Sequence, residues 1–150
     1  FIVVRHRNHL GVMTSTALPL TRDKASPTTI DFTVPSAPAY GMHPQKVLGN
    51  YRLMWAGNAN ADRFIVYQGA GVALPDRDFI FFEVFTNPLN VNYSYNHIVD
   101  GYEQGDTNLD GSMKYQGLGN DVDQFIFFNV LQHPANTSFF INFFITQQLP

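Results

Sequence analysis

Apolar and polar residues alternate in short runs over the first third of the chain, between closely spaced prolines. Phe1–Arg7 opens with β-branched and apolar residues, Leu10–Thr16 contains valine and threonine, and Thr28–Val34 alternates polar with apolar side chains. Such alternation is typical of half-buried strands, and proline is excluded from the middle of a sheet. The pattern predicts several short strands in a β-sandwich-like sheet over residues 1–50.

After Trp55 the pattern changes to polar loops, each followed by a compact apolar run. Phe79–Phe85 and Phe125–Leu131 both read Phe-Ile-Phe-Phe-x-Val, with aspartates before them and a proline after them. Periodicity leaves strand and helix open for so short a run, but Asp76 and Asp78 are typical N-cap residues and proline ends a helix. We expect a helix in each place and a final strand over Phe139–Thr146.

The two apolar runs belong to an internal duplication. Each copy contains a loop rich in asparagine and aspartate, then Tyr-Gln-Gly-x-Gly, then Asp-x-Asp, then the phenylalanine-rich run. Three motifs in one order, found twice, indicate a repeated structural unit. The expected fold is α+β and mostly β, with a β-sheet part at 1–50, incomplete alone, and a duplicated loop–helix part at 51–150.

The second copy begins with Asp106-Thr107-Asn108-Leu109-Asp110-Gly111, which has the pattern of a calcium loop. Calcium takes six to eight oxygen ligands, and such loops supply them from positions one, three and five, with a carbonyl at seven and a turn-making glycine at six. Position twelve is Gly117, which has no side-chain ligand, so a later aspartate must close the site. The predicted ligands are Asp106, Asn108, Asp110, the Ser112 carbonyl, and Asp121 or Asp123.

The first copy carries a weaker version of the same loop. It has asparagine at position one, where the second copy has aspartate, and Arg63 where the second copy has glycine. Fewer charges and a bulky turn residue predict weaker calcium binding. The predicted ligands are Asn58, Asn60, Asp62, and Asp76 or Asp78. The alternative is that these residues form turns without a metal, because asparagine, aspartate and glycine are also the commonest turn residues.

Composition narrows the classes of function. The chain has 150 residues, of which 45% are hydrophobic, so it can bury a core. A net charge of −3 without a basic block argues against nucleic acid, and no apolar run reaches the length of a membrane span. The absence of cysteine excludes disulfides and thiol catalysis, which leaves calcium as the expected staple and favours an extracellular location. The chain starts directly on an expected strand, so we expect it to be processed, truncated or cut from something larger.

Several motifs resemble known proteins. The second loop with its following helix resembles dockerin modules, which carry two calcium loop–helix repeats. Arg5-His6-Arg7-Asn8-His9-Leu10-Gly11-Val12, Trp55-x-Gly-Asn, the stretch Tyr-x-Gly-x-Gly-Asn-Asp ending at Asp121, and the terminal Gln148-Leu149-Pro150 resemble a recurring C-terminal region of large secreted surface proteins of Bacteroidetes-type bacteria. The resemblance implies secretion and a β part joined to a dockerin-like calcium part, with no known catalysis. In that family the segment Arg5–Val12 lies inside a β domain that starts upstream.

Other candidate residues favour structural roles. His6 and His9 need not converge on a strand, and zinc would need tighter ligand spacing than the isolated His43, His97 and His133 offer. No serine lies in a nucleophile elbow and no glycine-rich phosphate loop follows a strand, so no catalytic set emerges. Glycosylation sequons occur at Asn92 and Asn136. Surface tyrosines suited to stacking on sugars are Tyr93, Tyr95 and Tyr102.

Two functions remain from the sequence. The first is a non-enzymatic, calcium-stabilised extracellular module that assembles with copies of itself into a bacterial surface filament, by strand complementation at Phe1–Val4 or Phe139–Thr146. The second is a dockerin-like, carbohydrate-binding or adhesive module tethered to a larger secreted protein.

Overall fold

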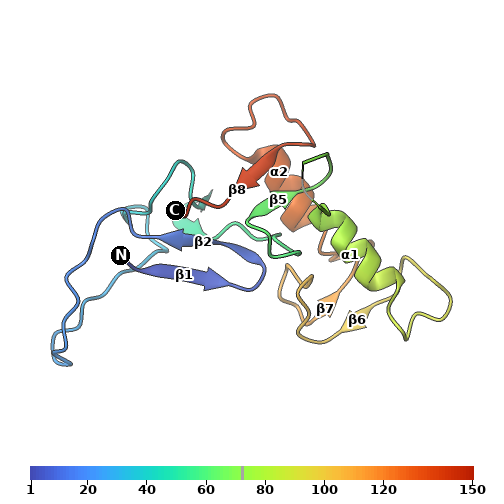
Figure 1. Ribbon diagram of the computed structural model, residues 1–150, viewed down its shortest axis with the longest axis horizontal. Coiled ribbons are helices and arrows are strands. Elements are labelled where there is room, and N and C mark those ends of the chain that lie inside the picture. Colours follow the sequence, from blue (N-terminus) through green and yellow to red (C-terminus); the bar gives the residue numbers. More distant parts are fainter. Residues whose placement is uncertain (72) are drawn as a thin grey trace.

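Short antiparallel strand pairs and two helical segments form this chain (Figure 1). The structure is a computed structural model that describes residues 1–71 and 73–150. The strand pairs are β1 (Val3–His6) with β2 (His9–Met13), β3 (Lys46–Leu48) with β4 (Tyr51–Leu53), β5 (Phe64–Val66) with β8 (Phe144–Thr146), and β6 (Val99–Asp100) with β7 (Ser112–Met113). The helices are α1 (Asp76–Phe85), the π-helical turn η1 (Asp123–Phe127) and α2 (Phe128–Gln132). The α+β class is confirmed, but every sheet in the described residues has two strands, so no sandwich forms there.

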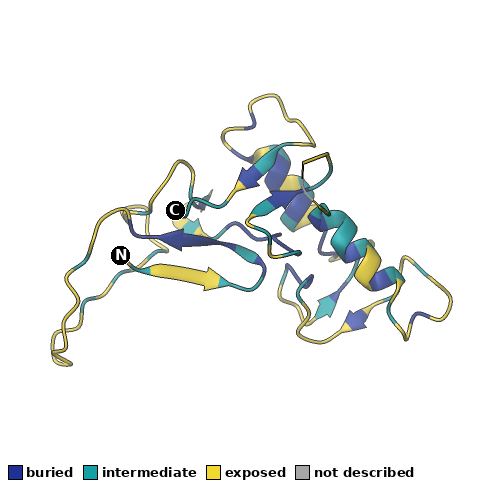
Figure 2. Cartoon of the chain, in the orientation of Figure 1, coloured by how far each residue is buried: buried dark blue, intermediate teal, exposed yellow. Residues whose placement is uncertain are grey.

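The N-terminal hairpin has one buried and one exposed strand (Figure 2). β2 is buried because it pairs with β1 on one side, while on the other side the Leu10 amide donates to the Trp55 carbonyl over 2.8 Å. Among residues 1–71 and 73–150, β1 pairs only with β2, and Val3 and Val4 remain exposed. The first strand therefore has a partner in its own chain and a free outer edge.

The prediction of a strand at Thr28–Val34 is wrong. Its residues form turns and irregular backbone instead. The Asp31 carboxylate accepts hydrogen bonds from the amide and the hydroxyl of Thr33, at 2.8 and 2.6 Å. An aspartate that bonds the backbone two residues ahead favours a turn over a sheet ladder, and the flanking Pro27 and Pro35 limit the segment further.

The duplicated part exchanges strands between its two copies. In each copy a short strand precedes a helix, and a second strand follows it: β5, α1 and β6 in the first copy, and β7, η1–α2 and β8 in the second. β5 pairs with β8, opposing Ile65 to Ile145, and β6 pairs with β7, opposing Val99 to Met113. The closing strand of each copy thus completes the opening strand of the other. Neither copy has its sheet without its partner.

One hydrophobic core joins both copies and the hairpin. Ile80 and Val84 of α1 and their counterparts Ile126 and Val130 are fully buried in one cluster, together with Leu10 of β2. Two glycines permit this packing at equivalent places. A Cβ on Gly57 would collide with the backbone carbonyl of Phe125, and one on Gly105 would meet Met113 and Ile80. Each loop therefore packs against the helix of the opposite copy.

Both predicted helices are confirmed, with differences at their ends. Pro75, and not an aspartate, is the N-cap of α1, and Asp76 is its first residue. The second helix begins with a π turn, in which the amides of Ile126 and Phe127 both donate to the Val122 carbonyl. The helices end at Phe85 and Gln132, before the prolines, as expected. The predicted strand at Phe139–Thr146 is reduced to β8, and residues 139–143 form irregular backbone and a turn.

Candidate metal-binding loops

The second loop (residues 106–114, closed by Asp121) folds its acidic side chains back onto its own backbone. The amide of Asp110 donates to Oδ1 of both Asp106 and Asn108, at 3.1 and 2.8 Å. The amide of Ser112 donates in turn to Asp110 Oδ1 at 2.9 Å. Side chains at positions one, three and five therefore point into one turn, as the sequence pattern predicts for a cation loop.

Asp121, and not Asp123, closes this loop. Its Oδ1 accepts the amides of Thr107 and Asn108, and its Oδ2 accepts the amide of Lys114 at 2.8 Å. These bonds tie the acid to positions two, three and nine of the loop. Asp123 is exposed and instead accepts a hydrogen bond from Asn120 Nδ2. Of the two aspartates that the sequence left open, only Asp121 therefore lies against the loop.

The first loop (residues 58–66, closed by Asp76) repeats the main backbone bonds of this network. Its fifth-position amide, from Asp62, donates to Oδ1 of Asn58 and of Asn60, both at 3.0 Å. Asp76 accepts the amides of Asn60 and Val66 at 3.3 and 2.7 Å, as Asp121 accepts those of Asn108 and Lys114. Asp78 pairs with Arg77 and takes no part in the loop. The duplication seen in the sequence is therefore also a duplication of hydrogen bonds.

The loops differ in charge more than in shape. Arg63 has φ 83°, close to the 87° of Gly111 at the equivalent position. Both residues have a left-handed backbone conformation. Arg63 therefore keeps the shape of the turn, but at the energetic cost that this conformation has for a residue with a side chain. The first loop nevertheless has asparagine in place of Asp106, and one carboxylate fewer.

Burial changes the acidity of the closing aspartates. Burial raises the pKa of Asp76 to about 8 and that of Asp121 to about 6, against the backbone hydrogen bonds that lower both. A hydrogen bond from the Ser112 hydroxyl, by contrast, holds the pKa of Asp110 below its ordinary value. A buried carboxylate without a counter-charge favours either a proton or a cation.

The donor chemistry fits a hard cation. The side chains directed into both loops are carboxylates and asparagine amides, which are oxygen ligands suited to calcium and not to zinc or copper. No three histidine, cysteine, aspartate or glutamate side chains converge closely enough to hold a metal in residues 1–71 and 73–150. A cation held at either loop would therefore need asparagine and main-chain oxygens beside the carboxylates.

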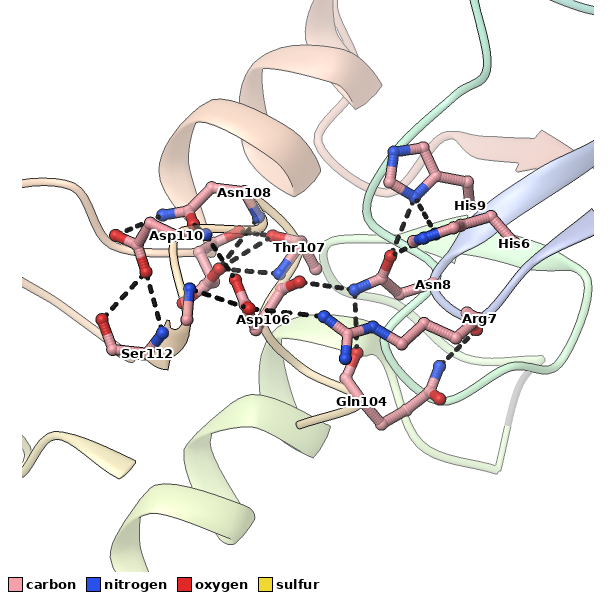
Figure 3. A network of polar contacts seen from close by, with 12 residues as sticks. His6, Arg7, Asn8, His9, Gln104, Asp106, Thr107, Asn108, Asp110 and Ser112 are labelled. Atoms are coloured by element: carbon pink, nitrogen blue, oxygen red, sulfur yellow. Dashed lines mark hydrogen bonds and ion pairs between the residues drawn. The ribbon is translucent and has the colours of Figure 1, made fainter. Parts of the chain in front are cut away.

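The turn of the N-terminal hairpin docks onto both loops, which the sequence did not predict. Figure 3 shows its contacts with the second loop. The side-chain amide of Asn8 donates to the carbonyls of Gln104 and Asp106. Arg7 places Nη2 3.3 Å from Asp106 Oδ2 and stacks on Tyr102, 3.2 Å from the ring centroid. In the described residues, Arg7 Nε and Nη1 are buried without a hydrogen-bond partner.

The histidines lie closer together than the sequence suggested. His6 Nδ1 and His9 Nδ1 are 3.0 Å apart, and both approach Asn8 Oδ1. The expectation that this pair need not converge is therefore wrong. Burial, with the nearby charges of His6 and Arg7, lowers the pKa of His9 to about 4. His43 and His133 are not isolated either, because their rings meet edge to face at 5.7 Å.

The two sequons differ in access. Asn92 is exposed, whereas Asn136 is 3% exposed. The Asn136 side-chain nitrogen donates to the carbonyls of Val130 and Phe140. A glycan at Asn136 would require these bonds to break, so the fold opposes modification there.

An open cleft of about 630 Å³ lies between the N-terminal hairpin and the β3–β4 hairpin. Its lining is largely apolar and includes Val4, Leu48 and Phe125. Arg5 and Arg52 also line it, and no described aspartate or glutamate does.

No protein-family model matches the chain, and neither a curated protein nor a solved structure matches it. Within residues 1–71 and 73–150, no helix combines the length and the apolar character that crossing a membrane demands.

Proposed function

We propose that the protein is a non-enzymatic, extracellular structural module of a bacterial surface, stabilised by calcium at two loops and assembling with copies of itself into a filament. The observation that carries the calcium part is the repeated network of the two loops. In both copies, three alternate side chains and one distant aspartate bond the same set of backbone amides.

Calcium supplies the positive charge that these loops lack. Asp106, Asp110 and Asp121 of the second loop together face Arg7 and Lys114, each at 3.3 Å from a carboxylate oxygen. Asp76 is fully buried and has no cationic partner among the described residues. Binding of a divalent cation compensates the desolvation of such carboxylates.

Calcium removal is the test of this proposal. Since cation binding favours the folded chain by mass action, 1 mM calcium should raise the melting midpoint by several degrees over the same protein in EDTA. Magnesium at equal ionic strength is the control, because its octahedral demand suits these loops less well. An equal midpoint in calcium and EDTA would sink the claim that calcium is structural.

Self-assembly is supported by the incomplete N-terminal sheets. A two-stranded hairpin is marginally stable alone, and β1 has a free outer edge with exposed Val3 and Val4. Val47 and Leu48 of β3 are also exposed, beside the cationic cleft. An added strand would satisfy the free edge and cover the apolar face together.

Deleting Phe1–Val4 should leave soluble subunits that no longer polymerise, as measured by sedimentation and negative-stain microscopy. Because the deletion also shortens β1, Val3→Lys is the milder variant: it puts a charge on an exposed strand without touching the core. Leu89→Lys is the matched control on an exposed apolar residue far from the hairpin sequence. Filaments of normal length from Val3→Lys would contradict assembly through β1.

The second candidate is a tethered binding or adhesive module, favoured by an aromatic surface along α1. Phe81 and Phe85 stack on each other at 5.3 Å, and Tyr95 stacks on both. Such a surface suits sugar rings or a partner protein. Microscopy of the purified protein separates the two functions, since a filament subunit gives filaments and a tethered module gives single particles.

A further inference from the structure

Asn8 bonds the beginning of both candidate cation loops. Its backbone carbonyl accepts the amides of Gly57 and Asn58, at 3.1 and 3.0 Å. Its side-chain nitrogen donates to the carbonyls of Gln104 and Asp106. Asn58 and Asp106 are the first-position residues of the two loops. One completely buried residue from the hairpin turn therefore joins equivalent points of both copies.

Gln104 forms a second connection across the same place. Its side-chain amide donates to the Arg7 carbonyl and, at 3.4 Å, to the Asn58 carbonyl. Residue 104 lies two positions before Asp106, so this bond also ties the start of the second loop to the first loop. The Arg7 side chain contacts the second loop through Asp106 (Figure 3).

We propose that this hairpin turn couples the two loops, so that a cation bound at one loop raises the affinity of the other. The proposal rests on calcium binding at the loops. A cation orders the loop that holds it, and an ordered first-position residue presents its backbone group to Asn8 in the geometry of the docked turn. Docking then holds the first residue of the other loop in place, which lowers the conformational cost of binding there. The coupling is reciprocal, as linkage requires.

The same coupling connects calcium to the proposed assembly edge. Asn8 lies directly between β1 and β2, so loops that hold Asn8 also hold the hairpin. Trp55 reports on this state, because its carbonyl accepts the Leu10 amide of β2 and its ring is 3% exposed. It is the one tryptophan of the sequence, so its emission is specific to this junction.

The experiment measures calcium affinity at the first loop with the second loop functional or disabled. Asp110→Ala disables the second loop, and calorimetry with Trp55 emission follows the first. In the otherwise unchanged chain, Asp110→Ala should weaken first-loop binding by about fivefold or more. In Asn8→Ala, which deletes the side-chain bonds, adding Asp110→Ala should weaken it by less than about twofold.

Two further variants provide an alternative to Asn8→Ala and a control. Gln104→Ala removes the second connection at a less buried site, so it replaces Asn8→Ala if that variant does not fold. It should also reduce the loss of first-loop calcium affinity that Asp110→Ala causes. Asn90→Ala is the matched control, since Asn90 is 4% exposed and its side chain bonds backbone carbonyls and one backbone amide near its own turn. It should keep the full fivefold effect.

The outcomes separate this proposal from the one beneath it. If both loops bind calcium but Asp110→Ala has the same effect with and without the Asn8 and Gln104 side chains, the coupling is overturned and the calcium proposal stands. If the unchanged chain binds no calcium, both proposals are overturned.

Discussion

The two copies of the repeat share a hydrogen-bond network but differ in the charges placed on it. Position one is Asn58 in the first loop and Asp106 in the second. Each accepts a hydrogen bond from the fifth-position amide of its own loop, at 3.0 and 3.1 Å. A neutral amide oxygen and a carboxylate oxygen thus serve the turn equally well. This bond therefore does not depend on the charge. The second carboxylate oxygen of Asp106, which Asn58 lacks, accepts the Gly111 amide at 3.1 Å and pairs with Arg7 at 3.3 Å.

The helices differ in a second way. α1 is regular, whereas its counterpart opens with a π turn. The π turn leaves the Phe125 carbonyl to accept a bond from Asn129 Nδ2, which also donates to Ala56 of the opposite copy. The first copy has Glu83 at that position, and it is exposed. The copies have diverged where one helix must bind the loop of the other.

Gly57→Ala should have the largest effect on this comparison. Gly57 has φ 116°, and an added methyl group would collide with a backbone carbonyl that has no freedom to move. We expect a loss of about 3 kcal/mol or more, or a fall of about 10 °C in melting midpoint. Thermal denaturation measures it.

Gly105→Ala is the control at the equivalent place. The added methyl group would meet mainly the sulfur of Met113, near the end of a flexible side chain. We expect a loss near 1 kcal/mol. Equal losses from both substitutions would show that the copies are packed alike and that the π turn has no part in the difference.

Changing the number of carboxylates in either loop should have a smaller effect. Asp110→Ala should remove the tighter of two calcium sites, because that loop has three carboxylates and the first has two. Asn58→Asp should strengthen the first site by about tenfold, since charge count sets affinity in such loops. Calorimetry resolves the two classes of site. Two equal sites in the unchanged chain would refute the charge argument.

The sequence predicted these loops and helices because local motifs carry them. Alternate Asx residues bond amides two and four residues ahead, so the six-residue pattern contains its own hydrogen bonds. The choice of Asp121 over Asp123, and of Asp76 over Asp78, required the fold. The two aspartates of each pair are two residues apart near the start of a helix, so they look alike in sequence. Only the backbone direction in the fold decides which of them faces the loop.

The strand pairing and the docking of the hairpin turn depend on contacts between residues that are distant in sequence. Asn8 meets Asp106 across 98 positions of sequence, and β5 pairs with β8 at the far end of the chain. No local periodicity encodes such pairings. Thr28–Val34 shows the opposite limit: its alternation is that of a strand, but no neighbouring strand is present to pair with it in the described residues.

The smallest predicted difference between the copies is a pH dependence. Asn87 and His133 occupy equivalent turns after the two helices. Asn87 Oδ1 accepts the Leu89 amide at 3.0 Å, and His133 Nδ1 accepts the Ala135 amide at 3.2 Å. Protonation would destroy the acceptor on the histidine but cannot affect the asparagine. Only the second turn should therefore respond to acid.

The sign follows from the pKa of His133. Burial, with the charge of His43, lowers this pKa from 6.5 to about 4, and Trp55 and Phe143 cover the ring. The folded chain then binds fewer protons than the unfolded chain between these values, so stability is full above pH 6.5 and falls as the pH drops toward 4. Between pH 7 and pH 5 the contribution of His133 falls by at most about 2 kcal/mol, or several degrees in melting midpoint. The raised pKa values of Asp76 and Asp121 act in the opposite direction, because the folded chain binds more protons on these carboxyls than the unfolded chain does. His133→Asn, which installs the residue of the first copy, should reduce this loss at constant calcium. Part of the loss should remain, because the pKa of His9 is lowered to about 4 as well. Melting curves of both proteins at pH 7, 6 and 5 measure the difference, and parallel curves would mean that the fold does not lower the pKa of His133, so that its turn tolerates the charge.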